Sequence, residues 1–60
     1  MPRESIFFAG EELFFSEELE TIDEAQAMLD YWRRRGFSAA CTHYEGKHQL
    51  YRAKAKFGRV

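Results

Sequence analysis

Hydrophobic positions recur with helical spacing in one stretch of the chain, residues 21–36. Four apolar residues in it fall at i, i+3, i+4 and i+7 and form a single stripe: Ala25, Met28, Leu29 and Trp32. Polar and charged residues fill most of the other positions. This pattern predicts one amphipathic helix, which covers a core with its apolar stripe.

The ends of this helix carry their own signals. Thr21 and Glu24 have the spacing of a capping box, in which each side chain accepts a hydrogen bond from the other residue's amide. Gly36 can adopt positive φ and end the helix. Basic residues before it suit the negative end of the helix dipole: Arg33, Arg34 and Arg35. Three arginines exceed what capping requires, so we also treat them as candidate contact residues.

Short apolar and aromatic runs precede the helix and favour strands. We expect a strand at 5–9, a turn at 10–12, a second strand at 13–15 and an acidic connection at 16–20. The two strands would form a hairpin. The alternative is one long strand with a β-bulge at Gly10.

After Gly36 the pattern changes to alternation, which predicts a second hairpin. Its strands are expected at 37–44 and 48–57, joined by a three-residue loop at 45–47, with a tail at 58–60. In the last strand, alternate residues share a face. One face carries Tyr51, Ala53, Ala55 and Phe57, and the other carries Arg52, Lys54 and Lys56.

The predicted fold is a single α+β domain over residues 1–60, a ββαββ antiparallel sheet with one helix on one face. The expected core is Ile6 or Phe7, Phe8, Leu13, Phe15, Ala25, Met28, Leu29, Trp32, Phe37, Ala39, Cys41, Tyr51, Ala53 and Ala55. One helix leaves the other sheet face open. Adjacent phenylalanines at Phe7-Phe8 and Phe14-Phe15 must point to opposite faces, and Tyr44 and Leu50 are further candidates for the open face. An exposed aromatic patch there predicts a partner surface or a homodimer.

Composition limits the possible functions. Sixty residues allow one small core, and 17% aromatic residues compensate in part for the small size. A deep catalytic cleft is hard to build at this size, so we expect no enzyme and no cofactor. One cysteine, no visible leader and no long apolar run predict a cytoplasmic protein without a membrane segment.

Charge is sorted along the chain although the net charge is only −1. Residues 1–31 hold nine acidic and one basic residue, and residues 32–60 hold eight basic and one acidic residue. Such asymmetry indicates a charged partner, or two halves that neutralise each other. Arg52, Lys54 and Lys56 could follow nucleic-acid phosphates, or protect a sheet edge from aggregation. The acidic residues, Glu11 and Glu12 among them, could instead imitate a row of phosphates.

Candidate catalytic and metal-binding residues are few. Cys41 and His43 share a strand face, but about two residues of strand rise separate them, which is too far for a nucleophile–base pair. A three-residue loop would place His48 opposite Tyr44 and hence on the other face. Zinc sites use four compatible ligands, so we expect no metal site.

Three features carry a resemblance to known proteins: the run Glu20-Thr21-Ile22-Asp23-Glu24-Ala25, the helix with Trp32, and Gly36-Phe37 leading into a hairpin. Together they resemble small phage proteins with a β-α-β-β core. These include podovirus inhibitors of bacterial RNA polymerase and anti-CRISPR proteins. The resemblance is one of form over roughly residues 13–57, and no binding residue carries over. Residues 36–39 and Tyr51-Arg52 also resemble half of a peptidoglycan-binding sporulation-related module, which needs a further helix and strand.

Three functions follow as hypotheses. The first is a non-enzymatic phage or mobile-element protein that inhibits a host complex of the CRISPR-effector or RNA-polymerase type. The second is a small nucleic-acid-binding protein that uses the basic last strand, and the third is an enzyme. The candidate partner-binding residues are Arg33, Arg34, Arg35, Arg52, Lys54, Lys56, Phe7, Phe14, Glu11 and Glu12.

Trp32 provides a test of the predicted fold. Replacing it by alanine should lower the free energy of unfolding by about 3–5 kcal/mol, because a large apolar side chain leaves the helix stripe. That loss approaches the whole stability of a small domain. A thermal melt followed by circular dichroism measures it, and an unchanged melting temperature would contradict the prediction.

Overall fold

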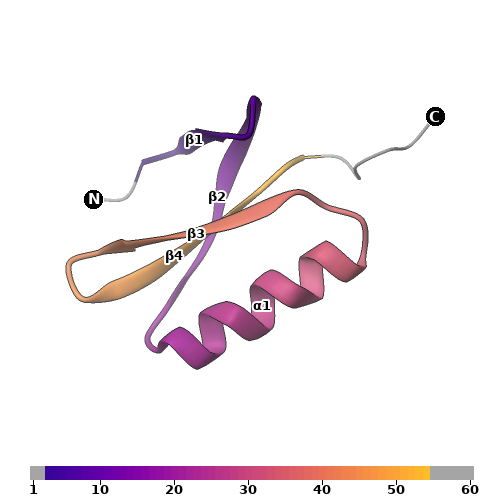
Figure 1. Ribbon diagram of the computed structural model, residues 1–60. Coiled ribbons are helices and arrows are strands. Elements are labelled where there is room, and N and C mark those ends of the chain that lie inside the picture. The colour runs from indigo at the N-terminus through magenta and orange to yellow at the C-terminus, as the bar shows by residue number, and fades with distance from the viewer. Residues whose placement is uncertain (1–2, 55–60) are drawn as a thin grey trace.

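The computed structural model describes residues 3–54 of the chain. These residues form four strands and one helix (Figure 1): β1 Ser5–Phe8, β2 Glu11–Leu19, α1 Ile22–Arg34, β3 Ala39–Tyr44 and β4 Lys47–Arg52. All the strand pairs are antiparallel. The predicted ββαββ arrangement of the α+β class is therefore confirmed.

The sheet has the strand order β1-β2-β4-β3, so the basic strand β4 lies inside the sheet. The expectation that it protects an edge is wrong, because β2 and β3 pair with its two sides. Within residues 3–54, the edges are β1 and β3. In Figure 1, β2 curves from its hairpin with β1 down to the start of α1, and α1 lies along one side of the sheet. We call that side the helix face and the other side the opposite face.

The helix begins and ends as its sequence signals predict. The hydroxyl of Thr21 accepts a hydrogen bond from the amide of Glu24 at 3.2 Å. Arg34 is the last helical residue, and Gly36 follows with φ 94°. The amide of Gly36 donates to the carbonyl of Arg33 at 3.0 Å, which satisfies one of the last helical carbonyls.

The strand β2 is longer than predicted at both ends. The turn before it consists of Ala9 and Gly10, with φ 53° and 81°, so Glu11 and Glu12 belong to the strand. The predicted acidic connection at 16–20 is wrong, because pairing with β4 continues to Leu19. The register shifts between Phe15 and Glu17. This bulge breaks the two-residue period that would otherwise have marked the strand.

The second hairpin has a shorter loop than predicted. Glu45 and Gly46 alone form it, with φ 52° and 78°, as two-residue loops of type I′ require. Tyr44 therefore lies opposite Lys47, and His43 lies opposite His48. The strand β3 begins at Ala39 rather than at residue 37. The strand β4 ends at Arg52, so the predicted last strand is wrong at Ala53 and Lys54. Its residues 55–57, Lys56 among them, lie outside the described residues.

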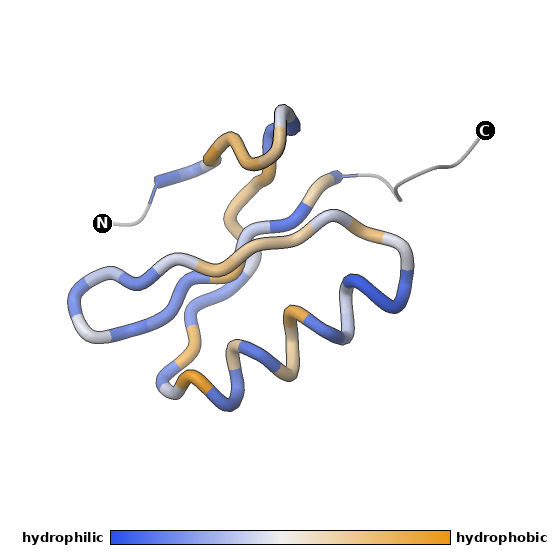
Figure 2. Tube along the Cα trace, viewed as in Figure 1, coloured by the Kyte–Doolittle hydropathy of each residue, from blue (hydrophilic) through white to orange (hydrophobic). Residues whose placement is uncertain are grey.

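The core is divided between the two faces of β4. Leu50 and Ala25 are both fully buried; Leu50 lies opposite Cys41, whose thiol contacts the Ala25 carbonyl of α1 at 3.8 Å. On the opposite face, Tyr51 packs in a second cluster with Leu13, Ala40, Ala53 and Ile6. The expectation that Leu50 joins an open face is wrong, because α1 covers it. Figure 2 shows apolar and hydrophilic segments in turn along α1, and a hydrophilic β3–β4 loop.

Several predicted core residues are less buried than expected. Phe8 and Phe15 are 49% and 39% exposed, because both lie on the opposite face, which the helix does not cover. Ile6, and not Phe7, packs against the core. Met28, Leu29, Trp32, Phe37 and Cys41 are half-buried. Ala55 lies outside the described residues.

Leu50 provides a test of the central position of β4. Replacing Leu50 by alanine should lower the free energy of unfolding by about 2–5 kcal/mol, because the side chain is fully buried between β4 and α1. Urea denaturation followed by circular dichroism measures the change. The matched control is Ile22→Ala, since Ile22 is 51% exposed and should change stability by about 0.5 kcal/mol or less. Equal losses in the two variants would contradict the described core.

Candidate functional site

Four of the predicted contact residues share the helix face of the sheet. Phe7 lies opposite Glu12 in the β1–β2 hairpin, and Phe14 lies two positions further along β2. Phe14 in turn lies opposite Arg52 of β4. Residues that are opposite or two apart share a face. The strands therefore align Phe7, Glu12, Phe14 and Arg52 along one surface.

Arg52 is held by aromatic rings and is not a free cation. Its guanidinium carbon lies 4.2 Å from the centroid of the Trp32 ring and 4.9 Å from that of Phe37. Its Nη1 donates to the carbonyl of Ala53 at 3.1 Å. Trp32 and Phe37 contact each other edge to face at 5.2 Å. This stack joins β4 to the last turn of α1, and Arg52 is half-buried within it.

The stack also leaves two polar atoms without partners. Arg52 Nε and Trp32 Nε1 are buried and make no hydrogen bond within the described part of the chain. Burying such groups costs about 1–3 kcal/mol each. The aromatic contacts must offset this cost, so the role of Arg52 is mainly in packing.

Of the two cations of the basic stripe within residues 3–54, Arg52 and Lys54, the more accessible is Lys54. It is exposed, and its Nζ lies 4.8 Å from the centroid of the Phe14 ring. A hollow of about 300 Å³ lies beside it, and its lining residues are Phe14, Phe15, Ser16, Arg52, Ala53 and Lys54. The structure thus brings together Phe14, Arg52 and Lys54, three of the predicted contact residues.

Each arginine at the end of α1 has a partner within the chain. Arg33 Nη2 donates to the carbonyl of Ala39 at 3.2 Å, on the edge strand β3. Arg34 forms an ion pair with Asp30, and the guanidinium of Arg35 lies 5.1 Å from the Tyr31 ring centroid. These contacts explain why the helix carries more arginines than capping requires. All three side chains are nevertheless exposed.

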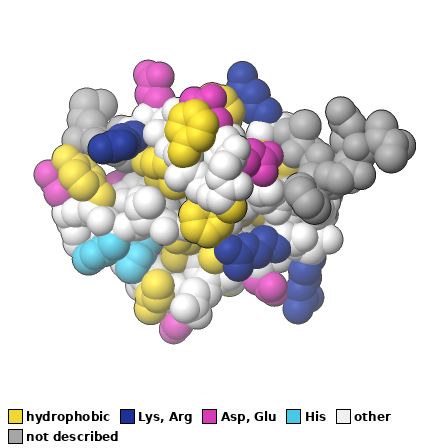
Figure 3. Space-filling model, turned by 45° about the horizontal axis from the view of Figure 1, so that its top comes forward, with side chains coloured by type: hydrophobic (Ala, Val, Ile, Leu, Met, Phe, Trp, Pro, Cys, Tyr) yellow, Lys and Arg dark blue, Asp and Glu magenta, His cyan; other side chains and the backbone are white. Residues whose placement is uncertain are grey.

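The tip of the β1–β2 hairpin carries the most exposed aromatic residues of the described chain. Phe7 is 74% exposed and Phe8 is 49% exposed. Glu12 and Glu11 lie opposite them on β2. Glu12 accepts a hydrogen bond from the Ser5 hydroxyl at 2.8 Å. We call Phe7, Phe8, Glu11 and Glu12 the hairpin tip. In Figure 3, hydrophobic side chains lie at the surface directly beside acidic ones.

The acidic residues do not form one row. Glu11 and Glu12 lie at the start of β2, whereas Glu18 lies at its far end, roughly 20 Å away at the rise of an extended strand. A second hollow of about 320 Å³ is lined by three acidic and three apolar residues: Glu18, Glu20, Glu24, Leu19, Ala27 and Met28. The acidic half of the sequence therefore forms two separate surfaces.

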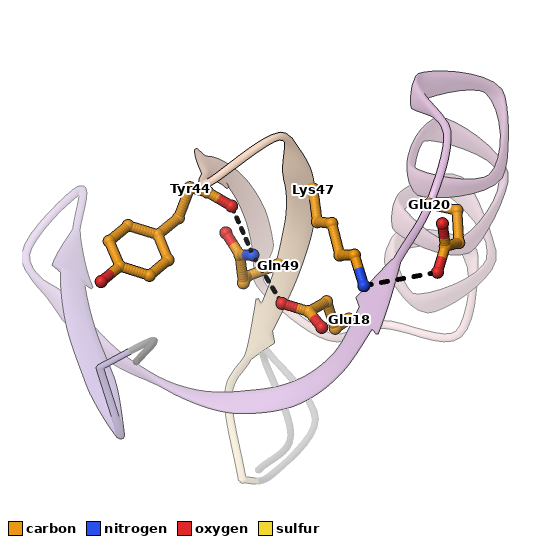
Figure 4. A network of polar contacts seen from close by, with 5 residues as sticks. All are labelled: Glu18, Glu20, Tyr44, Lys47 and Gln49. Atoms are coloured by element: carbon orange, nitrogen blue, oxygen red, sulfur yellow. Dashed lines mark hydrogen bonds and ion pairs between the residues drawn. The ribbon is translucent and has the colours of Figure 1, made fainter.

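The opposite face holds a buried polar side chain that the sequence pattern did not reveal. Gln49 is fully buried, and its Nε2 donates to Glu18 at 3.0 Å and to the Tyr44 carbonyl at 3.3 Å (Figure 4). Its Oε1 accepts from the Thr42 hydroxyl at 3.3 Å. One amide thus ties β2, β3 and β4 together. An ion pair between Lys47 and Glu20 at 3.6 Å lies beside this network.

A cavity of about 400 Å³ lies next to this network. It is lined by Arg3, Ile6, Thr42, His43, Tyr44, Gln49 and Tyr51. The Tyr51 hydroxyl donates to the Arg3 carbonyl at 3.0 Å, which connects the segment before β1 to the opposite face. Tyr51 and its apolar neighbours are buried within one chain. The homodimer expected through this face stays a prediction.

The two histidines do not lie on opposite faces, so that prediction is wrong. The two-residue loop places His43 opposite His48, on the face that also carries Cys41, and the two rings stack with centroids 5.0 Å apart. Residues 3–54 contain no group of three or more histidine, cysteine or acidic side chains able to hold a metal ion. The Cys41 thiol contacts the Ala25 carbonyl at 3.8 Å, and no contact joins it to either histidine in that range.

No family model matches the chain, and no curated protein or solved structure is significantly similar to it. The resemblance in form to phage inhibitors therefore stays a prediction. No helix within residues 3–54 has the length and apolarity needed to cross a membrane.

Burial raises the pKa of the Cys41 thiol above its ordinary value of 9.0, and the nearby Arg33 opposes this in part. A raised pKa means that the folded state favours the neutral thiol. The stability contributed is present at neutral pH and is lost as the pH rises through the raised pKa.

Alkylation by iodoacetamide tests this environment. We expect Cys41 to react several-fold more slowly in the folded chain than in urea at pH 8, because only the thiolate attacks and the thiol is half-buried. Equal rates in the two states would contradict the described burial.

Proposed function

We propose that this protein is a non-enzymatic inhibitor from a phage or mobile element that acts in the host cytoplasm. It would bind a nucleic-acid-handling complex, of the CRISPR-effector or RNA-polymerase type, through protein–protein contacts. The observation that carries the proposal is the exposure of Phe7 at 74%, beside Phe8 at 49%. The hairpin tip is the proposed contact surface.

Two exposed phenylalanines are unusual in a chain with so small a core. Fully burying a phenylalanine side chain contributes about 1.5–3 kcal/mol, which is valuable to a domain of this size. Neither Phe7 nor Phe8 makes that contribution to this fold. Aromatic anchors of this kind carry much of the binding energy in protein interfaces. Their exposure is therefore better explained by a partner than by stability.

The charge around these rings supports a partner with a basic surface. Glu11 and Glu12 lie directly opposite the two phenylalanines. Complexes that handle nucleic acids carry basic channels, since they neutralise phosphates. Acidic residues on an inhibitor would steer its approach to such a channel, and the aromatic rings would supply most of the affinity.

The second candidate function is direct nucleic-acid binding by the basic end of β4. The exposure of Lys54 beside Phe14 favours it, since cations and aromatic rings together suit single strands. The position of Arg52 weighs against it, because two rings and a backbone carbonyl hold its guanidinium. We rank it second.

A pull-down with tagged full-length protein from a bacterial lysate, with and without nuclease, separates the two functions. We expect a stoichiometric host protein that survives nuclease, and we expect Phe7→Ser to reduce its recovery at least about tenfold, as for a hot-spot residue. The matched control is Ile22→Ser, since Ile22 is also exposed at 51% but lies at the start of α1. Circular dichroism confirms that both variants fold.

Two results would contradict the proposal. Equal recovery of the host protein by Phe7→Ser and by the control would remove the hairpin tip as the contact surface. Recovery of nucleic acid with nuclease-sensitive proteins, lost on Lys54→Ala, would establish the second function instead.

A further inference from the structure

The two histidines form a second candidate site, at the loop end of β3 and β4 and away from the hairpin tip. His43 and His48 lie directly opposite each other, with ring centroids 5.0 Å apart and ring planes at 30°. Figure 3 shows the two histidine side chains adjacent at the surface. We propose that this pair chelates one divalent transition-metal ion of the Cu²⁺, Ni²⁺ or Zn²⁺ class.

The backbone fixes the spacing of the pair. The amide of Ala53 donates to the carbonyl of Ser38 at 2.9 Å, and hydrogen-bonded pairs alternate along an antiparallel ladder. The pair of Ser38 and Ala53 is therefore hydrogen-bonded. The pair of His43 and His48 lies five pairs further along the ladder, so it is of the non-hydrogen-bonded type, in which side chains lie closest. A single further pair, Tyr44 and Lys47, separates the histidines from the two-residue loop, so the register has little freedom to slip.

The separation of the rings suits a shared ion. A metal–nitrogen distance of about 2.0–2.1 Å places an ion about 3.2 Å from each ring centroid. Centroids 5.0 Å apart then correspond to a nitrogen–metal–nitrogen angle of roughly 100°, between the octahedral and tetrahedral values. The rings are nearly parallel, so one must rotate about χ2 to aim its lone pair. This torsion is soft, and His43 is exposed.

The surroundings leave the imidazole nitrogens available. Within residues 3–54, neither ring takes part in a hydrogen bond or ion pair, and the two rings contact each other by stacking. The neighbouring cation, Lys47, belongs to the other face of β4 and pairs with Glu20 at 3.6 Å. Since the described residues offer no third donor, water would complete the coordination shell. Imidazole ligands and Irving–Williams order favour Cu²⁺.

Isothermal titration calorimetry of the full chain with CuCl₂, NiCl₂ and ZnCl₂ tests the proposal. We expect one ion per chain, with Cu²⁺ bound most tightly, and no binding of Mg²⁺, which prefers oxygen ligands. His43→Ala and His48→Ala should each weaken Cu²⁺ binding at least about tenfold, since even outer-shell changes cost this much. The ion should also raise the melting temperature of the parent chain but not that of His43→Ala.

The matched control is Cys41→Ala, which removes the other metal-binding side chain of this face and should leave the affinity unchanged. Three outcomes would overturn the proposal: an unchanged affinity in both histidine variants, a loss of binding in Cys41→Ala, or one ion per two chains. His43 is exposed, so its variant should fold, and circular dichroism verifies this.

Discussion

The pairing of β4 on both sides and the burial of both its faces are the constraint on which the structure depends. Hydrogen bonds from β2 and β3 hold its two edges. Leu50 is buried on the helix face, and the next residue, Tyr51, is buried on the opposite face. A chain of sixty residues cannot build a thick core on either side. Two thin clusters share one strand instead, and each covers one of its faces.

This arrangement decides which side chains remain outside. The helix covers the half of the sheet around β3 and β4, and the β1–β2 hairpin extends past its end. Within residues 3–54, no element therefore covers Phe7, and we propose that a partner does. At the C-terminal end of the helix, Arg52 packs where an apolar residue would be expected, stacked on Trp32 and Phe37. Of the basic stripe, Arg52 thus contributes to packing, and Lys54 lies at the surface.

The order of elements could be predicted because its signals are local. Thr21 and Glu24 cap the helix, Gly36 follows its end, and alternation marks β4. The prediction errors arise where one residue more or less shifts the pairing register of two strands. A bulge after Phe15 hides the second half of β2, and a loop of two residues rather than three places His43 opposite His48. The burial of Gln49 depends on partners from two other strands, β2 and β3, which no local pattern encodes. Adjacency predicted one exposed phenylalanine in the Phe7-Phe8 pair, but both are exposed, because α1 does not reach Phe7 on the helix face and the second core cluster does not include Phe8 on the opposite face.

Native-state amide hydrogen exchange, measured by nuclear magnetic resonance, tests the central position of β4 most directly. Exchange rates report the free energy of the opening that exposes each amide. We expect the slowest exchange at Gln49–Tyr51, whose strand is paired on both sides and buried on both faces. Exchange should be fast at Phe7 and Phe8 in the edge strand β1. Amides in β4 that exchange as fast as those in β1 would show that β4 is not the most protected strand.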